Sequence, residues 1–135
     1  MNIRVSLYFL GTLYLVLGGF ISVLPLMPKT NKELKKILTK GKFQIRMGVL
    51  GIFSCLIFAF FPYDKILLIG DFFPTLASFI LTFLFIVGYI RNSKHIDQKT
   101  LSRADHILSI IQVPAGFLGI SVGFIHVILP GIILI

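Results

Sequence analysis

The chain has 135 residues, a formal net charge of +8 and a mean hydropathy of +0.97, with 56% hydrophobic and only 13% charged residues. Soluble domains carry about 25% charged residues, so this composition excludes an ordinary soluble domain and places the chain in a lipid bilayer. Its one cysteine excludes an intrachain disulfide and any metal site built from several cysteines.

Four apolar stretches are long enough to cross the bilayer as helices, because a spanning helix needs about 20 apolar residues. In chain order they cover residues 5–27, 43–61, 72–90 and 107–129. The first stretch ends in LPLMPKTNK, without a small-residue cleavage site, so we expect a retained span and not a secretory signal. The predicted fold is an all-α integral membrane four-helix bundle, with residues 1–135 forming one transmembrane domain.

Lysine and arginine are concentrated in the two segments that connect span one to span two and span three to span four. Basic segments stay on the cytoplasmic side, so both should face the cytoplasm and both termini should lie outside. Only Arg4 and Lys65 then lie outside. We expect a multi-pass protein of the cell (inner) membrane. The basic residues that we assign to the inner leaflet in the first connection are Lys32, Lys35, Lys36, Lys40, Lys42 and Arg46.

The first connection also has the pattern of a short amphipathic helix. Thr30 followed by Glu33 fits a capping box, and Leu34, Ile37 and Leu38 recur near helical spacing with lysines between them. Such a helix would lie on the inner leaflet and bind anionic lipid headgroups. The alternative is a solvated loop whose lysines only set the orientation.

Other polar residues predict where the later spans begin and end. Ser102 and Asp105 could cap the fourth span, and Asp71 suits the N-cap of the third, with Pro74 in its first turn. Proline lacks an N–H and clashes with the preceding turn, so Pro130 should kink or end the fourth span.

The second and fourth spans resemble each other in sequence. Residues 44–62 pair with residues 112–130 at a constant offset. The matching pairs are Gln44 and Gln112, Gly48 and Gly116, Leu50 and Leu118, Gly51 and Gly119, Ile52 and Ile120, Ile57 and Ile125, and Pro62 and Pro130. We predict a tandem duplication, with repeat 1 at about 1–65 and repeat 2 at about 66–135, inserted in the same sense. The alternative is that two glycine-spaced helices converged.

Small residues recur every four positions on both of these spans. The first stripe is Gly51, Cys55 and Ala59 beside Gly48, and the second is Ala115, Gly119 and Gly123 beside Gly116. This spacing puts small side chains on one helix face and lets two backbones approach closely. The stripes are predicted packing surfaces, either inside the bundle or against a second copy or another membrane protein.

Intramembrane polar groups are candidate functional sites, because their burial is costly. Gln44 and Gln112 could bond to each other across the axis that relates the repeats, or could face headgroups. His126 and Asp71 could form a pair at the outer mouth, although capping is the simpler role for Asp71. His126 has no second His, Cys or carboxylate at metal-ligating spacing, so no metal or cofactor is predicted.

No Ser or Cys has a base within reach in the sequence pattern, so we expect no enzyme. The positive charge flanks the spans and reflects orientation, so nucleic acid is not an expected partner. The sequence favours a small membrane protein that acts through helix–helix contacts, as an accessory subunit, an assembly factor or a homo-oligomer. The alternative is a small transporter or channel with its pathway at the repeat interface.

Overall fold

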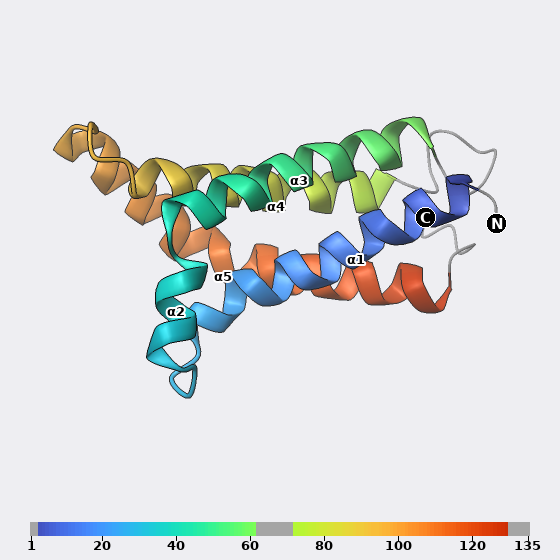
Figure 1. Ribbon diagram of the computed structural model, residues 1–135, viewed down its shortest axis with the longest axis horizontal. Helices are drawn as coiled ribbons and strands as arrows, with labels where there is room; N and C mark the ends of the chain where they lie inside the picture. The colour runs from blue at the N-terminus through green and yellow to red at the C-terminus, as the bar shows by residue number, and fades with distance from the viewer. Residues whose placement is uncertain (1–2, 62–71, 130–135) are drawn as a thin grey trace.

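The computed structural model describes residues 3–61 and 72–129. Within these residues the chain is all-helical (Figure 1). In chain order, the elements are α1 (Ile3–Val23), the 3-10 turn η1 (Leu24–Leu26), α2 (Lys32–Leu38), α3 (Gly41–Phe60), α4 (Phe72–Arg91) and α5 (Gln98–Ile128). Four helices, α1 with η1, α3, α4 and α5, are long and apolar enough to cross a membrane. The predicted all-α four-helix membrane bundle is therefore confirmed.

The four long helices lie side by side in one elongated bundle (Figure 1). α1 packs along α5, α3 packs along α4, and α4 also packs on α5. α1 and α4 run in one direction and α3 and α5 in the other, so the two hairpins have the same sense (Figure 1). This is the geometry that a tandem duplication requires, but the duplication itself stays a prediction.

The bundle is held together by a few large buried side chains and by close backbone contacts. Tyr8, Leu15, Phe58, Leu81 and Phe85 are almost completely buried in its centre. α1 and α5 approach so closely that a Cβ on Gly19 would lie 2.5 Å from the carbonyl oxygen of Gly116. Without a hydrophobic effect between helices in lipid, such close packing is a main source of stability.

The fourth span begins earlier than the sequence predicts. α5 starts at Gln98 instead of residue 107, and its 31 residues are about 46 Å long at 1.5 Å per residue. The hydrocarbon core is only about 30 Å thick, so the first turns extend beyond it. Apolarity marks the part of a helix inside lipid, and it cannot mark polar turns that continue the same helix in water.

Both predicted caps in the described residues are wrong. Asn31 is the N-cap of α2 and accepts a hydrogen bond of 2.9 Å from the backbone N–H of Glu33, while the Thr30 hydroxyl donates to the carbonyl of Leu24. Asp97 precedes α5, which places Ser102 and Asp105 inside the helix. The proposed cap at Asp71 and the helix end at Pro130 lie outside the described residues.

Candidate functional site

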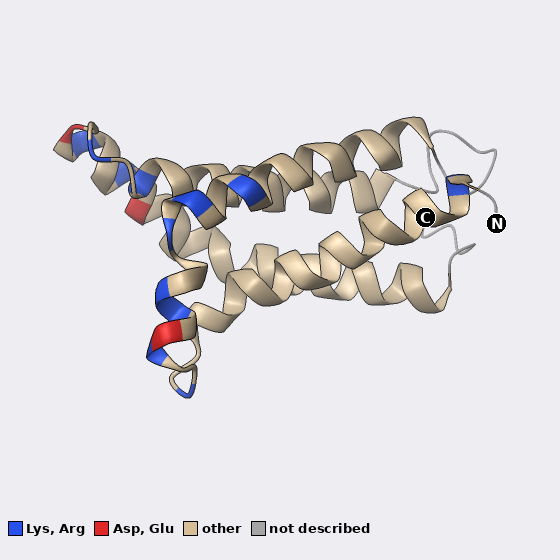
Figure 2. Ribbon diagram, viewed as in Figure 1, with Lys and Arg blue, Asp and Glu red and all other residues tan. Residues whose placement is uncertain are grey.

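The end of the bundle that contains α2 and the α4–α5 connection carries most of the charge, and we call it the basic end. Figure 2 shows the lysines and arginines of both connections gathered there, while the first turn of α1, with Arg4, lies at the opposite end. The predicted inner-leaflet residues Lys32, Lys35, Lys36, Lys40, Lys42 and Arg46 are all on α2, on the first turns of α3 or between them. Two of the apolar residues of the predicted amphipathic helix, Leu34 and Ile37, are exposed on α2.

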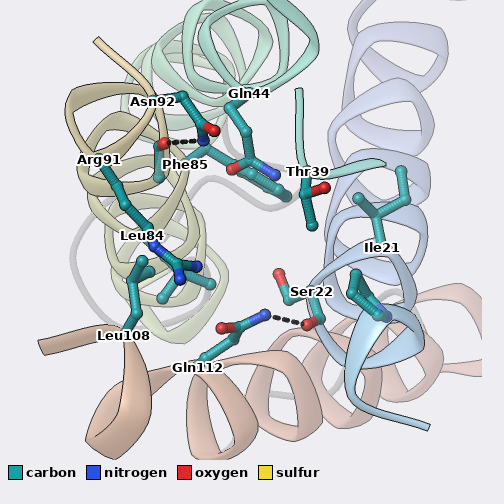
Figure 3. Close-up of a pocket in the computed structure, with 12 residues that line it drawn as sticks. Ile21, Ser22, Thr39, Gln44, Leu84, Phe85, Arg91, Asn92, Leu108 and Gln112 are labelled. Atoms are coloured by element: carbon teal, nitrogen blue, oxygen red, sulfur yellow. Dashed lines mark hydrogen bonds between the residues drawn. The ribbon is translucent and has the colours of Figure 1, made fainter. Parts of the chain in front are cut away.

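A pocket of about 40 Å³ opens among the helices at the basic end, and we call it the polar pocket (Figure 3). All four long helices contribute to it. Its lining residues are Ile21, Ser22, Pro25, Thr39, Gln44, Leu84, Phe85, Gly88, Arg91, Asn92, Leu108 and Gln112. The pocket thus contains both glutamines that sequence analysis singled out.

The two glutamines do not bond to each other across the bundle as the sequence suggested. Gln44 Nε2 donates to the carbonyl oxygen of Leu38 at 2.6 Å, and Gln112 Nε2 donates to that of Ser22 at 2.7 Å. Each amide therefore ties its helix to a backbone carbonyl of a preceding segment. Their oxygens and remaining N–H groups are left for other partners at the pocket.

Arg91 and Asn92, at the end of α4, complete the polar side of the pocket. Arg91 Nε lies 2.6 Å from Asp105 Oδ1, and both side chains are about half exposed, at 51% and 49%. Asn92 Nδ2 donates to the carbonyl of Gly88 at 2.7 Å. Asp105, predicted as a cap, is therefore an ion-pair partner that joins α5 to α4. The Arg91 guanidinium extends toward the interior of the pocket in Figure 3.

An apolar groove runs along the bundle between α1 and α3, and we call it the α1–α3 groove. It has a volume of about 310 Å³ near the basic end and continues toward Leu7 and Phe60 at the other end. Its lining residues near the basic end are Leu10, Gly11, Leu13, Tyr14, Leu17, Ile21, Phe43, Met47, Leu50, Phe53, Ser54 and Ile57. Ile21 borders both the groove and the polar pocket.

Sequence analysis missed Ser54 on the floor of the groove and two buried hydroxyl residues behind it on α4, Ser78 and Thr82. Ser54 and Ser78 have their hydroxyl oxygens 3.0 Å apart, and Ser54 also donates to the Gly11 carbonyl at 3.4 Å. Thr82 donates to the Ser78 carbonyl at 2.7 Å. The four-residue spacing of Ser78 and Thr82 was the available signal, because it puts both on one face of α4.

The stripe on α5 faces into the bundle, and so do the two glycines of the stripe on α3. A side chain on Gly51 would meet the hydroxyls of Thr82 and Tyr14, and one on Gly119 would meet Leu81 and the Leu15 carbonyl. Gly48 is buried against α4, and Gly116 and Gly123 are buried against α1. Ala115 is also buried. Cys55 is partly buried, with its sulfur 3.8 Å from the Thr75 carbonyl, and Ala59 is exposed. The inward packing face of α3 therefore follows Ser54 and Phe58 instead of Cys55 and Ala59.

His126 is buried where α5 meets α1, near the end opposite the basic end. Its Nδ1 lies 2.9 Å from the Val122 carbonyl oxygen, and its ring centroid lies 6.4 Å from that of Tyr8. Its Nε2 has no hydrogen-bond partner among the described residues. The proposed partner Asp71 lies outside those residues, so the pair stays a prediction. Among all the residues that the structure describes, no group of three His, Cys, Asp or Glu side chains could hold a metal ion.

Comparison with known proteins gives one match. No curated protein and no solved structure matches the chain. Residues 4–126 match the model of an uncharacterised protein family. Because the match covers most of the sequence, including parts of all four long helices, this protein belongs to that family.

Proposed function

We propose that this protein is a noncatalytic accessory protein of the membrane that holds another membrane molecule in the α1–α3 groove. The observation that carries the proposal is that this groove is open although the comparable contact between α4 and α5 is closed. Leu13, Leu50 and Phe53 at the groove are 51%, 53% and 59% exposed, whereas Leu81 and Leu84 of α4 are buried. The open contact offers a second molecule an apolar surface that the closed contact does not.

The inward orientation of the glycine stripes favours the same groove. Close helix–helix contact in membranes uses small residues, and the stripes at Gly48 and Gly116 are occupied within the chain. A surface for a second molecule must then lie elsewhere. The α1–α3 groove is the apolar candidate that extends along most of a span.

We further propose that the basic end faces the cytoplasm and that the protein belongs to the cell (inner) membrane. The support is the concentration of lysine and arginine at one end of the bundle (Figure 2). In this orientation α1 begins and α5 ends on the outer side. Cysteine labelling of intact cells tests it: Lys36→Cys, at an exposed position of α2, should stay unlabelled until the membrane is permeabilised.

A noncatalytic role agrees with how the buried hydroxyls are used. Thr12, Ser22 and Thr82 each donate to a carbonyl of their own helix at 2.7 to 2.9 Å. A hydroxyl that is engaged in this way satisfies itself locally and is not activated by a base. We therefore assign these groups to packing.

A second candidate function is a small transporter with its pathway at the junction of the four helices. The observation in its favour is the polar pocket, which reaches into this junction from the basic end. Phe85 borders the pocket, and the bundle interior next to it is filled by the buried side chains of Leu15 and Leu81. A pathway would require these side chains to move, so we rank transport second. Solute flux into vesicles that contain the purified protein tests it.

Photocrosslinking in native membranes tests the proposed function. A photoreactive phenylalanine analogue replaces Phe53 in the groove or, as the matched control, Phe117, which is 56% exposed on α5. We expect residue 53 to give a discrete adduct of defined mass and residue 117 to give only diffuse reaction with bulk lipid. Equal and diffuse reaction at both positions would rule out the groove as a binding surface.

A further inference from the structure

We propose that the α1–α3 groove and the polar pocket together form a binding site for one phospholipid with an anionic headgroup. The acyl chain lies in the groove and the phosphate lies at the pocket. This inference rests on the proposed function and names the molecule that the groove holds. Four features support it: the length of the groove, its position next to the pocket, the charge around the pocket and the residues that line the walls.

The groove has the length that an acyl chain requires. From Phe43 to Ile57 it follows α3 for fourteen residues, which is about 21 Å at 1.5 Å per residue. The chains of one leaflet cover about 15 Å, half of the hydrocarbon thickness of about 30 Å. A chain that starts at the basic end can therefore lie within the groove for its full depth in the membrane.

The groove and the pocket share Ile21 in their linings, so they are neighbours, and one amphipathic molecule that passes this side chain can reach both. On the apolar side of this residue lie Leu17 and Met47, and on the polar side lie Gln44 and Gln112. The pocket is small, about 40 Å³, with room for only a few water molecules. A small polar group such as a phosphate fits this space, whereas a bulky sugar headgroup would have to remain outside.

The charge around the pocket favours an anion. Arg91 uses its Nε for Asp105, which leaves the other guanidinium N–H groups available on the side of the pocket (Figure 3). Lys40 and Lys42 flank the pocket in sequence, between Thr39 and Gln44, and Arg46 follows on the first turns of α3. Asp105 is the acidic group that competes for Arg91. The excess is cationic, which matches an anionic headgroup.

The walls of the groove favour a lipid chain over a protein helix. Tight helix association in membranes needs small residues at the contact. The exposed walls consist of large side chains, among them Leu10, Leu13, Leu50 and Phe53. Such walls leave a narrow and flexible space that suits a hydrocarbon chain. A transmembrane helix about 10 Å wide would meet these side chains before it reached the floor at Gly11.

Tryptophan fluorescence provides the test, because the chain has no tryptophan of its own. The purified full chain carries Phe53→Trp in the groove or Phe117→Trp on α5 as the control. Each variant is placed in phosphatidylcholine vesicles that contain a fixed minor fraction of either phosphatidylglycerol or phosphatidylcholine with brominated, quenching chains. We expect brominated phosphatidylglycerol to quench the groove tryptophan more strongly than brominated phosphatidylcholine, while both lipids quench the control tryptophan equally.

Two results would overturn the inference. Equal quenching of the groove tryptophan by the two lipids would show that the headgroup is not selected. Protection of the groove tryptophan from both lipids, relative to the control, would show that a protein segment fills the groove; the proposed function would then survive with a different occupant. Because photocrosslinking at residue 53 tests the groove without reference to headgroups, the two proposals can fail separately.

Charge variants on the Phe53→Trp background locate the headgroup. Arg91→Gln should reduce the preference for phosphatidylglycerol about fivefold, because one cation near a membrane surface attracts an anionic lipid by about 1 kcal/mol. Lys94→Gln removes the same charge from the α4–α5 connection, outside the pocket, and should change the preference much less. Asp105→Asn releases Arg91 from its ion pair and should raise the preference. Equal effects of the Arg91 and Lys94 variants would contradict a headgroup site at the pocket.

Discussion

The contact between α1 and α3 and the contact between α4 and α5 have the same place in the two hairpins but differ in packing. α4 and α5 bury Leu81, Leu84 and Leu108 between them, and the Arg91–Asp105 ion pair joins their ends. α1 and α3 meet through Gly11, Phe58 and other groups at the floor, and their large side chains remain exposed above it. One hairpin of this fold therefore closes on itself, while the other leaves a surface that a separate molecule can cover.

The largest expected difference between the two hairpins is the loss of stability when a side chain in each contact is shortened. Leu81 is completely buried, so Leu81→Ala should lower the free energy of unfolding by about 2–5 kcal/mol, through lost contacts and the cavity that remains. Leu13→Ala, in the open groove, should change it by less than about 0.5 kcal/mol. Unfolding of the purified protein in mild detergent measures both. Similar losses at the two positions would mean that the groove is as well packed as the closed contact.

Two adjacent glycines on α1 provide the next test: Gly19 faces α5, whereas Gly18 faces α4. A Cβ on Gly19 would lie 2.5 Å from a backbone oxygen of Gly116, so Gly19→Ala should force the helices apart and cost about 1–3 kcal/mol. A Cβ on Gly18 would find its nearest neighbours at 3.5 Å, an ordinary contact. Gly18→Ala should therefore be neutral or stabilising by up to about 1 kcal/mol. The same unfolding measurement decides, and a neutral Gly19→Ala would contradict the close α1–α5 approach.

The glutamines, one on each hairpin, should have smaller and similar effects on stability. Gln112→Leu removes the hydrogen bond to the Ser22 carbonyl, and Gln44→Leu removes that to the Leu38 carbonyl. Each change should cost about 1 kcal/mol, a typical value for a side-chain hydrogen bond inside a membrane bundle. If the two glutamines instead bonded to each other, the double variant would cost no more than either single variant. A double-variant cycle by unfolding in detergent distinguishes these outcomes.

The smallest expected difference between the hairpins is a pH dependence of stability at the start of α5, in the basic connection between α4 and α5. A hydrogen bond with the Thr100 side chain lowers the pKa of Asp97 below its ordinary value of 3.8. A lowered pKa in the folded state means that the Asp97 carboxylate stabilises the start of α5 above that ordinary value, and that this contribution is lost as the pH falls below it. Asn31, which caps α2, has no titratable group.

Hydrogen exchange of backbone amides measures this difference. We expect the first turn of α5 to lose protection between about pH 5 and pH 3, beyond the intrinsic effect of pH on exchange, and the first turn of α2 to show no such loss. Asp97→Asn should remove the pH dependence from α5. A loss of protection that persists in this variant would assign the effect to another group.

Much of the architecture could be predicted because the thickness of the membrane sets the length of an apolar run that spans it. Three of the four spans begin and end within four residues of their predicted bounds. The start of α5 at Gln98 could not be predicted in this way, because its polar first turns lie beyond the apolar run. The cap at Asn31 was missed because Thr30 and Glu33 fit an equally good capping pattern one residue earlier.

The candidate site was predictable only in part. Gln44 and Gln112 were identified because polar groups are rare within spans, and the fold brings both to one pocket. Their partners are backbone carbonyls, which every residue has and which no sequence pattern marks. The groove could not be predicted either, since an exposed Leu50 or Phe53 has the same appearance in sequence whether it faces bulk lipid or one bound molecule.

Native mass spectrometry of the protein released from mild detergent can show directly whether the open hairpin holds a lipid. We expect the unmodified chain to retain one anionic phospholipid, and we expect Leu13→Trp combined with Leu50→Trp, which fills the groove, to remove it. Phe117→Trp combined with Phe124→Trp, on the exposed face of α5, should leave the bound lipid in place. Retention of the same lipid by the groove-filled variant, or loss from both double variants alike, would contradict a binding site between α1 and α3.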